Sequence, residues 1–295
     1  NNIEAMVAHR NLLKNDRALS KSLERLASGQ RINRAADDPA ALVISEHMRA
    51  EISGMKQAIR NNEIAISLVQ TAEGSMNEIS SLLISIRQRA ISAANVGASD
   101  AAMTQANQSE IENALSSIDR IVSSTQFGQY KLLDGTNARK ILEDGSTKEG
   151  LRFHVGPDAG HMASVSIRNM TTSHLGTLAE GQEPNKSNFM SLADIDVSTE
   201  QGSQDALALI DQSITEVATV RGELGAFQRN TLESNLTSLQ VASENMTSAE
   251  STLRDTDMAQ ELATFTRNQI MSQSATAQLA QANALPQNVL RLLNI

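Results

Sequence analysis

Residues 69–93, VQTAEGSMNEISSLLISIRQRAISA, carry the pattern that decides the fold of this chain. Their apolar side chains recur at alternating steps of three and four residues, which is the spacing of a coiled-coil seam. This stripe consists of Val69, Ala72, Met76, Ile79, Leu83, Ile86, Ala90 and Ala93. The spacing predicts one long amphipathic helix, over about residues 45–98, that packs against other helices.

The predicted partners of this helix lie at different distances along the chain. A second helix is expected over about residues 103–124, capped at its start by Asp100 after a break, and it forms an antiparallel hairpin with the first. A third stripe begins at Leu207 and continues to Leu253, with a one-residue register change near Gly222 and Gly225. The N- and C-terminal thirds of the chain must therefore pack together, with the middle as an insertion.

The middle of the chain carries a different periodicity. Apolar residues alternate with polar ones over residues 151–155 and again over 163–167, and the turn-forming segment 156–160 separates the two runs. This pattern predicts a β-hairpin. The fold class we expect is mainly α, an elongated rod of long antiparallel helices from both chain ends with a small β-hairpin element in the middle.

Composition excludes several function classes. The 295 residues include 40% hydrophobic but only 2% aromatic side chains, which suits thin seams between helices. A formal charge of -9 argues against nucleic acid or an anionic membrane as partner. No signal peptide or membrane-spanning stretch is recognisable. The five histidines lack paired-ligand spacing and no catalytic motif occurs, so we expect no enzyme activity, no cofactor and no metal.

The chain ends have leucine stripes that they cannot bury alone. Ordering a residue costs roughly 1–2 kcal/mol, and each end offers little apolar surface to offset this cost, so both ends should be mobile in the free monomer. Between the first stripe and the long helix, Gly29 can end one helix, and Asp38 can cap the next helix with Pro39 at its first position.

Two segments of the sequence resemble the signatures of a known family. The stretch S-G-Q-R-I-N-R-A-A-D-D-P, residues 28–39, is similar to the N-terminal signature of bacterial flagellins, and residues 60–62 and 70–79 continue the match. Residues 255–261 and 279–290 resemble the flagellin C-terminal signature. The similar regions cover roughly two thirds of the chain.

This resemblance implies a structural subunit that polymerises into the flagellar filament for swimming. Residues 1–40 and 256–295 would form the filament inner core, and residues 41–255 a helical spoke domain with its β-hairpin region at about 128–202. The chain would be exported unfolded by the flagellar type III apparatus. Its expected partners are copies of itself, an export chaperone and the export apparatus, hook-associated and cap proteins, and an innate immune receptor. The expected location is an extracellular flagellar filament, with a periplasmic filament as the alternative.

The resemblance and the leucine stripes together select candidate site residues. The candidate assembly interface consists of Leu12, Leu19, Leu23, Leu26, Arg31, Asn33, Asp37, Asp38, Leu279, Asn283, Pro286, Gln287, Asn288, Val289 and Leu290. The candidate receptor surface consists of Arg87, Arg89 and Glu110, of which Arg89 stands where the family usually has an apolar residue.

Two alternative functions remain open at this point. A hook-filament junction protein resembles flagellin at both ends, and its low copy number in isolated flagella would distinguish it. A secreted coiled-coil adhesin would bind a host surface and stay unpolymerised.

Overall fold

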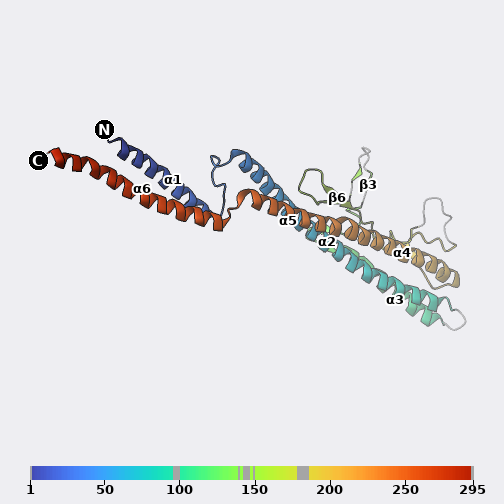
Figure 1. The fold of residues 1–295 in the computed structure, drawn as a ribbon. Coiled ribbons are helices and arrows are strands. Elements are labelled where there is room, and N and C mark those ends of the chain that lie inside the picture. Colours follow the sequence, from blue (N-terminus) through green and yellow to red (C-terminus); the bar gives the residue numbers. More distant parts are fainter. Residues whose placement is uncertain are drawn as a thin grey trace. The chain divides into compact units, whose positions relative to one another are not determined.

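The long helix predicted from the apolar stripe is α2 (Pro39–Ala93) in the computed structural model, which describes residues 2–95, 100–138, 140–141, 147–148, 150–177 and 186–293 (Figure 1). It begins six residues before the expected start, because Asp38 accepts a hydrogen bond from Ala41 N (3.0 Å) and Pro39 opens the helix. Every residue of the stripe at 69–93 is buried, with at most 4% of its surface exposed. The predicted stretch 96–98 lies outside the described residues.

The chain divides into two compact units. The terminal unit consists of Asn1–Ser53 and Ala242–Ile295, and the central unit of Gly54–Val241. The predicted division places the boundaries between filament core and spoke at residues 40/41 and 255/256. It describes which residues become buried between subunits when the chain polymerises. It therefore stays a prediction.

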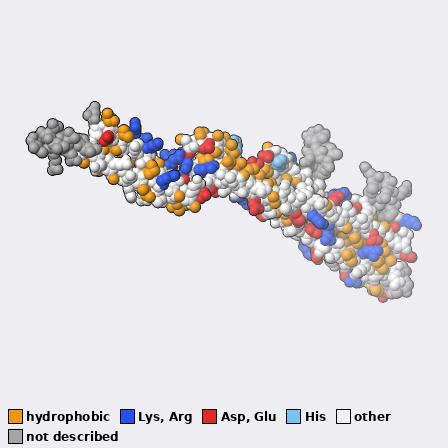
Figure 2. Space-filling model, viewed as in Figure 1, with side chains coloured by type: hydrophobic (Ala, Val, Ile, Leu, Met, Phe, Trp, Pro, Cys, Tyr) orange, Lys and Arg blue, Asp and Glu red, His pale blue; other side chains and the backbone are white. Residues whose placement is uncertain are grey.

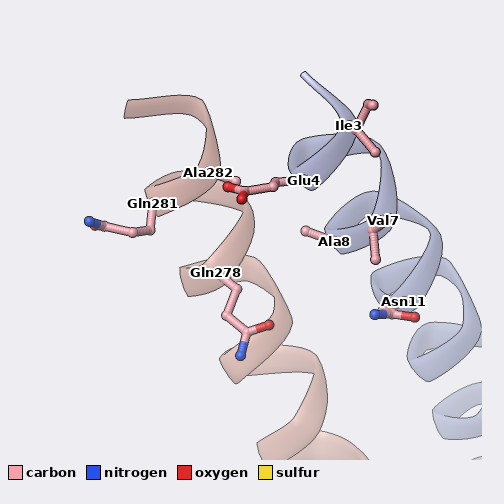
Figure 3. Close-up of a pocket in the computed structure, with 8 residues that line it drawn as sticks. All are labelled: Ile3, Glu4, Val7, Ala8, Asn11, Gln278, Gln281 and Ala282. Carbon is pink, nitrogen blue, oxygen red and sulfur yellow. The ribbon is translucent and has the colours of Figure 1, made fainter. Parts of the chain in front are cut away.

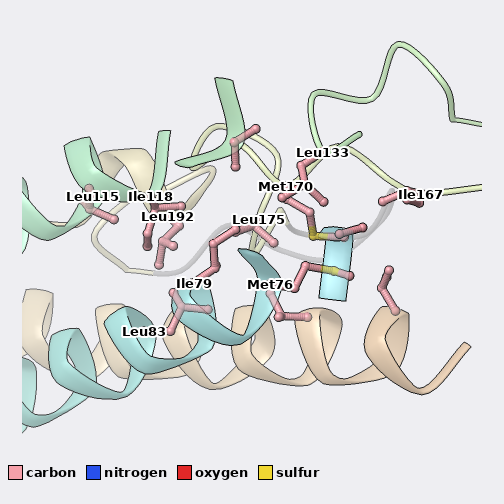
Figure 4. Close-up of a cluster of buried hydrophobic side chains, with 14 of the residues drawn as sticks. Met76, Ile79, Leu83, Leu115, Ile118, Leu133, Ile167, Met170, Leu175 and Leu192 are labelled. Atoms are coloured by element: carbon pink, nitrogen blue, oxygen red, sulfur yellow. The ribbon is translucent and has the colours of Figure 1, made fainter. Parts of the chain in front are cut away.

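In the central unit, α3 (Ala101–Ser124) and α4 (Glu200–Phe227) lie alongside α2 (Figure 1). Asp100 caps α3 as expected, since its Oδ1 accepts a hydrogen bond from Met103 N at 2.8 Å. Buried side chains of the three helices form one cluster with loop residues, as Figure 4 shows for Met76, Ile79 and Leu83 of α2. The loop contributions to this cluster include Leu132, Leu133, Ile167, Met170, Leu175 and Leu192.

The predicted register change in the third stripe appears as a π-helical turn, η2 (Gln228–Glu233), between α4 and α5 (Ser234–Arg254). A π-turn accommodates one extra residue without ending the helix. Gln228 Nε2 donates to Glu233 Oε1 at 2.8 Å, a pairing five residues apart that suits this wider turn. The change falls a few residues after Gly222 and Gly225, which stay inside regular α4.

The predicted β-hairpin is confirmed as β5 (Leu151–His154) paired antiparallel with β6 (Met162–Val165). Three asparagines hold the end of β5: Asn61 donates to His154 O (3.0 Å), and Asn62 (3.2 Å) and Asn235 (2.6 Å) donate to Val155 O. The hairpin is thereby fixed to both α2 and α5.

Short elements that the sequence analysis did not anticipate complete the described fold. They are the strand pairs β1 (Gln126–Phe127) with β2 (Tyr130–Lys131) and β3 (Lys140–Ile141) with β4 (Thr147–Lys148), and the 3-10 turn η1 (Leu192–Asp194). The predicted mainly α fold with a small β element is confirmed. Within the described ranges, no helix combines the length and apolar character that a membrane crossing requires.

Candidate assembly interface

The terminal unit is built on two helices from opposite ends of the chain, α1 (Ile3–Ser28) and α6 (Met258–Leu293). Their hydrogen bonds show an antiparallel pairing: Asn2 Nδ2 donates to Ala282 O (2.7 Å), Asn15 Nδ2 to Met271 O (3.3 Å), and Ser272 Oγ to Asp16 Oδ1 (2.7 Å). Near the other end of the pair, Arg25 and Glu261 form an ion pair at 3.5 Å. Polar contacts therefore join the two helices along the length of the pair.

This two-helix pair leaves much of its apolar surface uncovered. Ile3 is 71% exposed and Leu23 is 54% exposed, and further large apolar side chains are exposed on both helices (Figure 2). They include Met6, Val7, Leu13, Met258, Leu262, Ile270 and Met271. A pair of helices has no second layer to cover such side chains, so other chains must do so if they are to be buried.

A groove runs between the two helices near the chain ends (Figure 3). It has a volume of about 400 Å³ and is mainly apolar on the α1 side. Its lining consists of Ile3, Glu4, Val7, Ala8 and Asn11 from α1, and Gln278, Gln281 and Ala282 from α6. The groove adds a concave surface to the exposed apolar side chains of the pair.

The segments that leave α1 and enter α6 pair with each other, and we call Gly29–Arg31 with Leu253–Thr256 the linker clasp. Arg31 N donates to Arg254 O (2.7 Å) and Thr256 N donates to Gly29 O (3.0 Å), on either side of an antiparallel bridge between Gln30 and Asp255. Gly29 adopts a positive φ of 72° and ends α1, as expected.

The polar signature residues act within the chain around this clasp. The guanidinium of Arg31 donates to Leu253 O at 2.6 Å, and Asn33 Nδ2 donates to Ser28 Oγ at 3.2 Å. Asp37 pairs with Lys21 at 2.6 Å. The Asp37 carboxylate also accepts hydrogen bonds from the backbone N–H groups of residues 33 and 34, and Asp38 caps α2.

The leucines predicted for the interface differ in exposure. Leu12, Leu19, Leu26 and Leu279 are half-buried in the α1–α6 pair, whereas Leu23 and Asn283 are exposed. The segment 286–290 has a helical backbone within α6, and its side chains lie outside the described residues.

Sequence reasoning missed Arg254 and Glu46. Arg254 donates to Gln30 Oε1 (3.2 Å) and to Glu46 Oε1 (2.6 Å), so it links the clasp to α2. Arg254 directly precedes the C-terminal signature at residues 255–261, which was the one available signal. Glu46 lies in α2 without any local motif.

Two carboxyl groups in this region have lowered pKa values. The Lys21 ammonium hydrogen-bonded to Asp37 holds the pKa of that carboxyl below its ordinary value, against the opposing effect of partial desolvation. The Arg254 guanidinium likewise lowers the pKa of Glu46.

We expect the terminal unit to lose stability as the pH falls below about 4. Both carboxyls have lower pKa values in the folded chain than in the unfolded chain. Their ionised forms therefore stabilise the fold fully when the pH is above the pKa values of the unfolded chain. This stabilisation is lost as the pH falls through the pKa values of the folded chain. Urea titrations of assembled filaments, in which the terminal unit is ordered by its neighbours, at pH 6 and pH 3 measure the effect through the concentration of released subunits. Equal midpoints at the two pH values would contradict it.

The candidate receptor residues lie on the surface of the central unit, in ion pairs between helices. Arg87 binds Asp211 of α4 through two contacts (2.6 and 3.4 Å), and Arg89 binds Glu110 of α3 at 2.7 Å. Asp211 raises the pKa of Arg87 further above its ordinary value. All four side chains remain about half exposed, so they are accessible in the isolated chain.

Paired helices from both chain ends, with apolar side chains that the chain itself leaves uncovered, define a class of helical subunits that assemble with copies of themselves. The chain belongs to the bacterial flagellins. The profile of the bacterial flagellin N-terminal helical region matches residues 1–138, and that of the C-terminal helical region matches residues 207–293. The chain is therefore a structural subunit of a flagellar filament that self-polymerises, and it is not an enzyme.

Relatives of nearly the same length support this assignment. Flagellin of Bacillus subtilis strain 168 is 41% identical, and the match covers 99% of this chain and 98% of the relative. The flagellar filament 30.7 kDa core protein of Treponema maltophilum is 37% identical with the same coverage.

A comparison with solved structures shows a likeness in fold. A putative flagellar hook-associated protein from Vibrio parahaemolyticus matches with a TM-score of 0.58 and 17% identity, covering 74% of this chain and 99% of that protein. At this identity the likeness concerns the fold alone. It therefore does not favour the junction-protein alternative over the filament subunit that the full-length relatives indicate.

Proposed function

We propose that filament growth takes place through the terminal unit, with residues 1–40 and 256–295 as the filament inner core and residues 41–255 as the spoke. The observation that carries this proposal is the set of exposed apolar side chains on α1 and α6. Covering them with other copies removes apolar area from water, at about 25 cal/mol per Å².

Under this proposal, the interface residues have two different roles. The leucines at positions 12, 19, 23, 26 and 279, with Asn283 and the segment 286–290, contact neighbouring copies. Arg31, Asn33, Asp37 and Asp38 hold the linkers so that α1 and α6 present a defined surface. Because α1 and α6 offer different faces, the contacts are heterologous, and such contacts produce an open helical polymer when the rotation does not close.

The same feature supports export in an unfolded state. The terminal helices bury few side chains within one chain, so ordering them without neighbours offsets little of its entropic cost. We infer passage through the flagellar type III apparatus with an export chaperone covering the chain end, and contact with hook-associated and cap proteins at the ends of an extracellular filament. A periplasmic filament would use the same contacts.

Recognition by an innate immune receptor is proposed at Arg87, Arg89 and Glu110. The ion pairs of these residues are half exposed and offer both charges at the surface of the central unit. Binding there would exchange intramolecular partners for those of the receptor.

Substitution of Leu23 by Ser tests the assembly surface. We expect the critical concentration for elongating filament fragments to rise roughly tenfold or more, because a leucine transferred from water into an interface contributes about 1.5–3 kcal/mol. The unfolding temperature of the monomer should change little, since Leu23 is mostly exposed there.

The matched control is Met190→Ser, which removes an exposed apolar side chain from a loop of the central unit. Light scattering on a concentration series of each variant gives the critical concentration. An unchanged critical concentration for Leu23→Ser would contradict the proposal that α1 contributes to the interface.

A further inference from the structure

The β5–β6 hairpin carries a nitrogen and a sulfur ligand atom at chelating distance. His154 and Met162 are directly opposite each other in the ladder, and His154 Nδ1 lies 3.1 Å from Met162 Sδ. Met162 is 42% exposed and His154 is half-buried, so the pair lies at the surface of the hairpin. The spacing of the histidines in the sequence does not reveal this pair, because its second member is a methionine.

We propose that this pair binds a soft monovalent metal ion, Cu(I) or its analogue Ag(I). Thioether sulfur selects soft ions, and neutral imidazole is a ligand for copper. The separation of 3.1 Å is short enough for one ion to contact both atoms. Two neighbouring coordination positions are thus filled, and solvent supplies the others.

The position of the two atoms is set by the fold rather than by a mobile loop. Four residue pairs of the ladder fix the strands, and Asn61 of α2 donates to His154 O at 3.0 Å. The ion binds the neutral imidazole, whose remaining proton resides on Nε2. In the metal-free chain, a proton on Nδ1 would instead be donated to the sulfur.

The local charge favours an ion of low charge. Arg152 precedes His154 by two residues in β5, so its side chain points to the same face of the hairpin. A nearby guanidinium disfavours divalent ions more strongly than monovalent ones. In addition, no cluster of three or more His, Cys, Asp or Glu exists among the described residues to hold a harder ion.

Silver binding to the full-length monomer tests this site. Ag(I) in a chloride-free buffer is titrated into the parent, His154→Gln and Met162→Leu, and the methyl NMR signals of methionine report occupancy. The parent should saturate with one ion at Met162, and each variant should bind at least tenfold more weakly. His161→Gln and Met190→Leu are the matched controls and should stay within twofold of the parent.

Three results would overturn the site. They are unchanged affinity in either variant, an equal loss in the His161→Gln control, and Zn(II) binding to the same pair as tightly as Ag(I). The site does not depend on polymerisation, so none of these outcomes bears on the assembly role of the terminal unit.

Discussion

A chain that ends at Asp255 should keep its central unit folded and lose elongation of filament fragments altogether. The truncation removes all of α6, and with it the hydrogen-bond partners of Asn2, Asn15 and Asp16. It also removes Thr256, one of the two backbone donors that close the linker clasp. Without α6, α1 has no partner in its own chain and half of the proposed assembly surface is missing.

The expected loss is complete because several contributions disappear together. Each buried apolar side chain on α6 would contribute about 1.5–3 kcal/mol to adding one subunit, and loss of several such contacts exceeds the free energy that subunit addition provides. The central unit ends at Val241, so its own contacts remain intact.

Electron microscopy of filament fragments mixed with the truncated chain measures the outcome. The helical signal by circular dichroism and the unfolding temperature serve as the control, since they show whether α2, α3 and α4 remain packed. Growth of the fragments at the parent rate would refute the role of the terminal unit in assembly.

Local rules explain which parts of the fold could be predicted from the sequence. The α2 stripe, the Asp100 and Asp38 caps and the β5–β6 hairpin each depend on residues within a few positions of one another. The third apolar stripe also indicates a register change near Gly222 and Gly225. The π-turn that accommodates an extra residue lies a few residues later, at Gln228–Glu233.

Long-range contacts to backbone atoms could not be predicted in the same way. The guanidinium of Arg31 bonds the carbonyl of Leu253, which is 222 residues away. A carbonyl acceptor leaves no trace in the sequence, since every residue has one. Arg31 was therefore selected only by its place in the family signature, and its intramolecular contact came from the structure.

The exposed apolar side chains show a second limit. Periodicity identified leucines on α1, yet Leu12, Leu19 and Leu26 are half-buried while Leu23 is exposed. A 3.6-residue period indicates which side chains share a face, but the neighbouring helix decides which of them are covered. Ile3 and Ile270, which no stripe selected, are exposed for the same reason.

Substitution of Leu83 by Ala should destabilise the central unit by about 2–5 kcal/mol, whereas Ile84→Ala should cost well below that range. The two residues are neighbours in α2 and differ in burial: Leu83 is fully buried in the central cluster, and Ile84 is 49% exposed. Alanine has a higher helix propensity than either, so backbone effects do not produce the difference.

The difference between the two variants isolates packing as its cause. Leu83 lies in the cluster with Ile79, Leu115 and Leu192 (Figure 4), and its loss leaves a cavity that fixed helices cannot close fully. Urea unfolding of each variant, followed by circular dichroism, gives the two free energies of unfolding. Equal losses for Leu83→Ala and Ile84→Ala would mean that the apolar stripe at 69–93 does not form the packed seam on which the central unit depends.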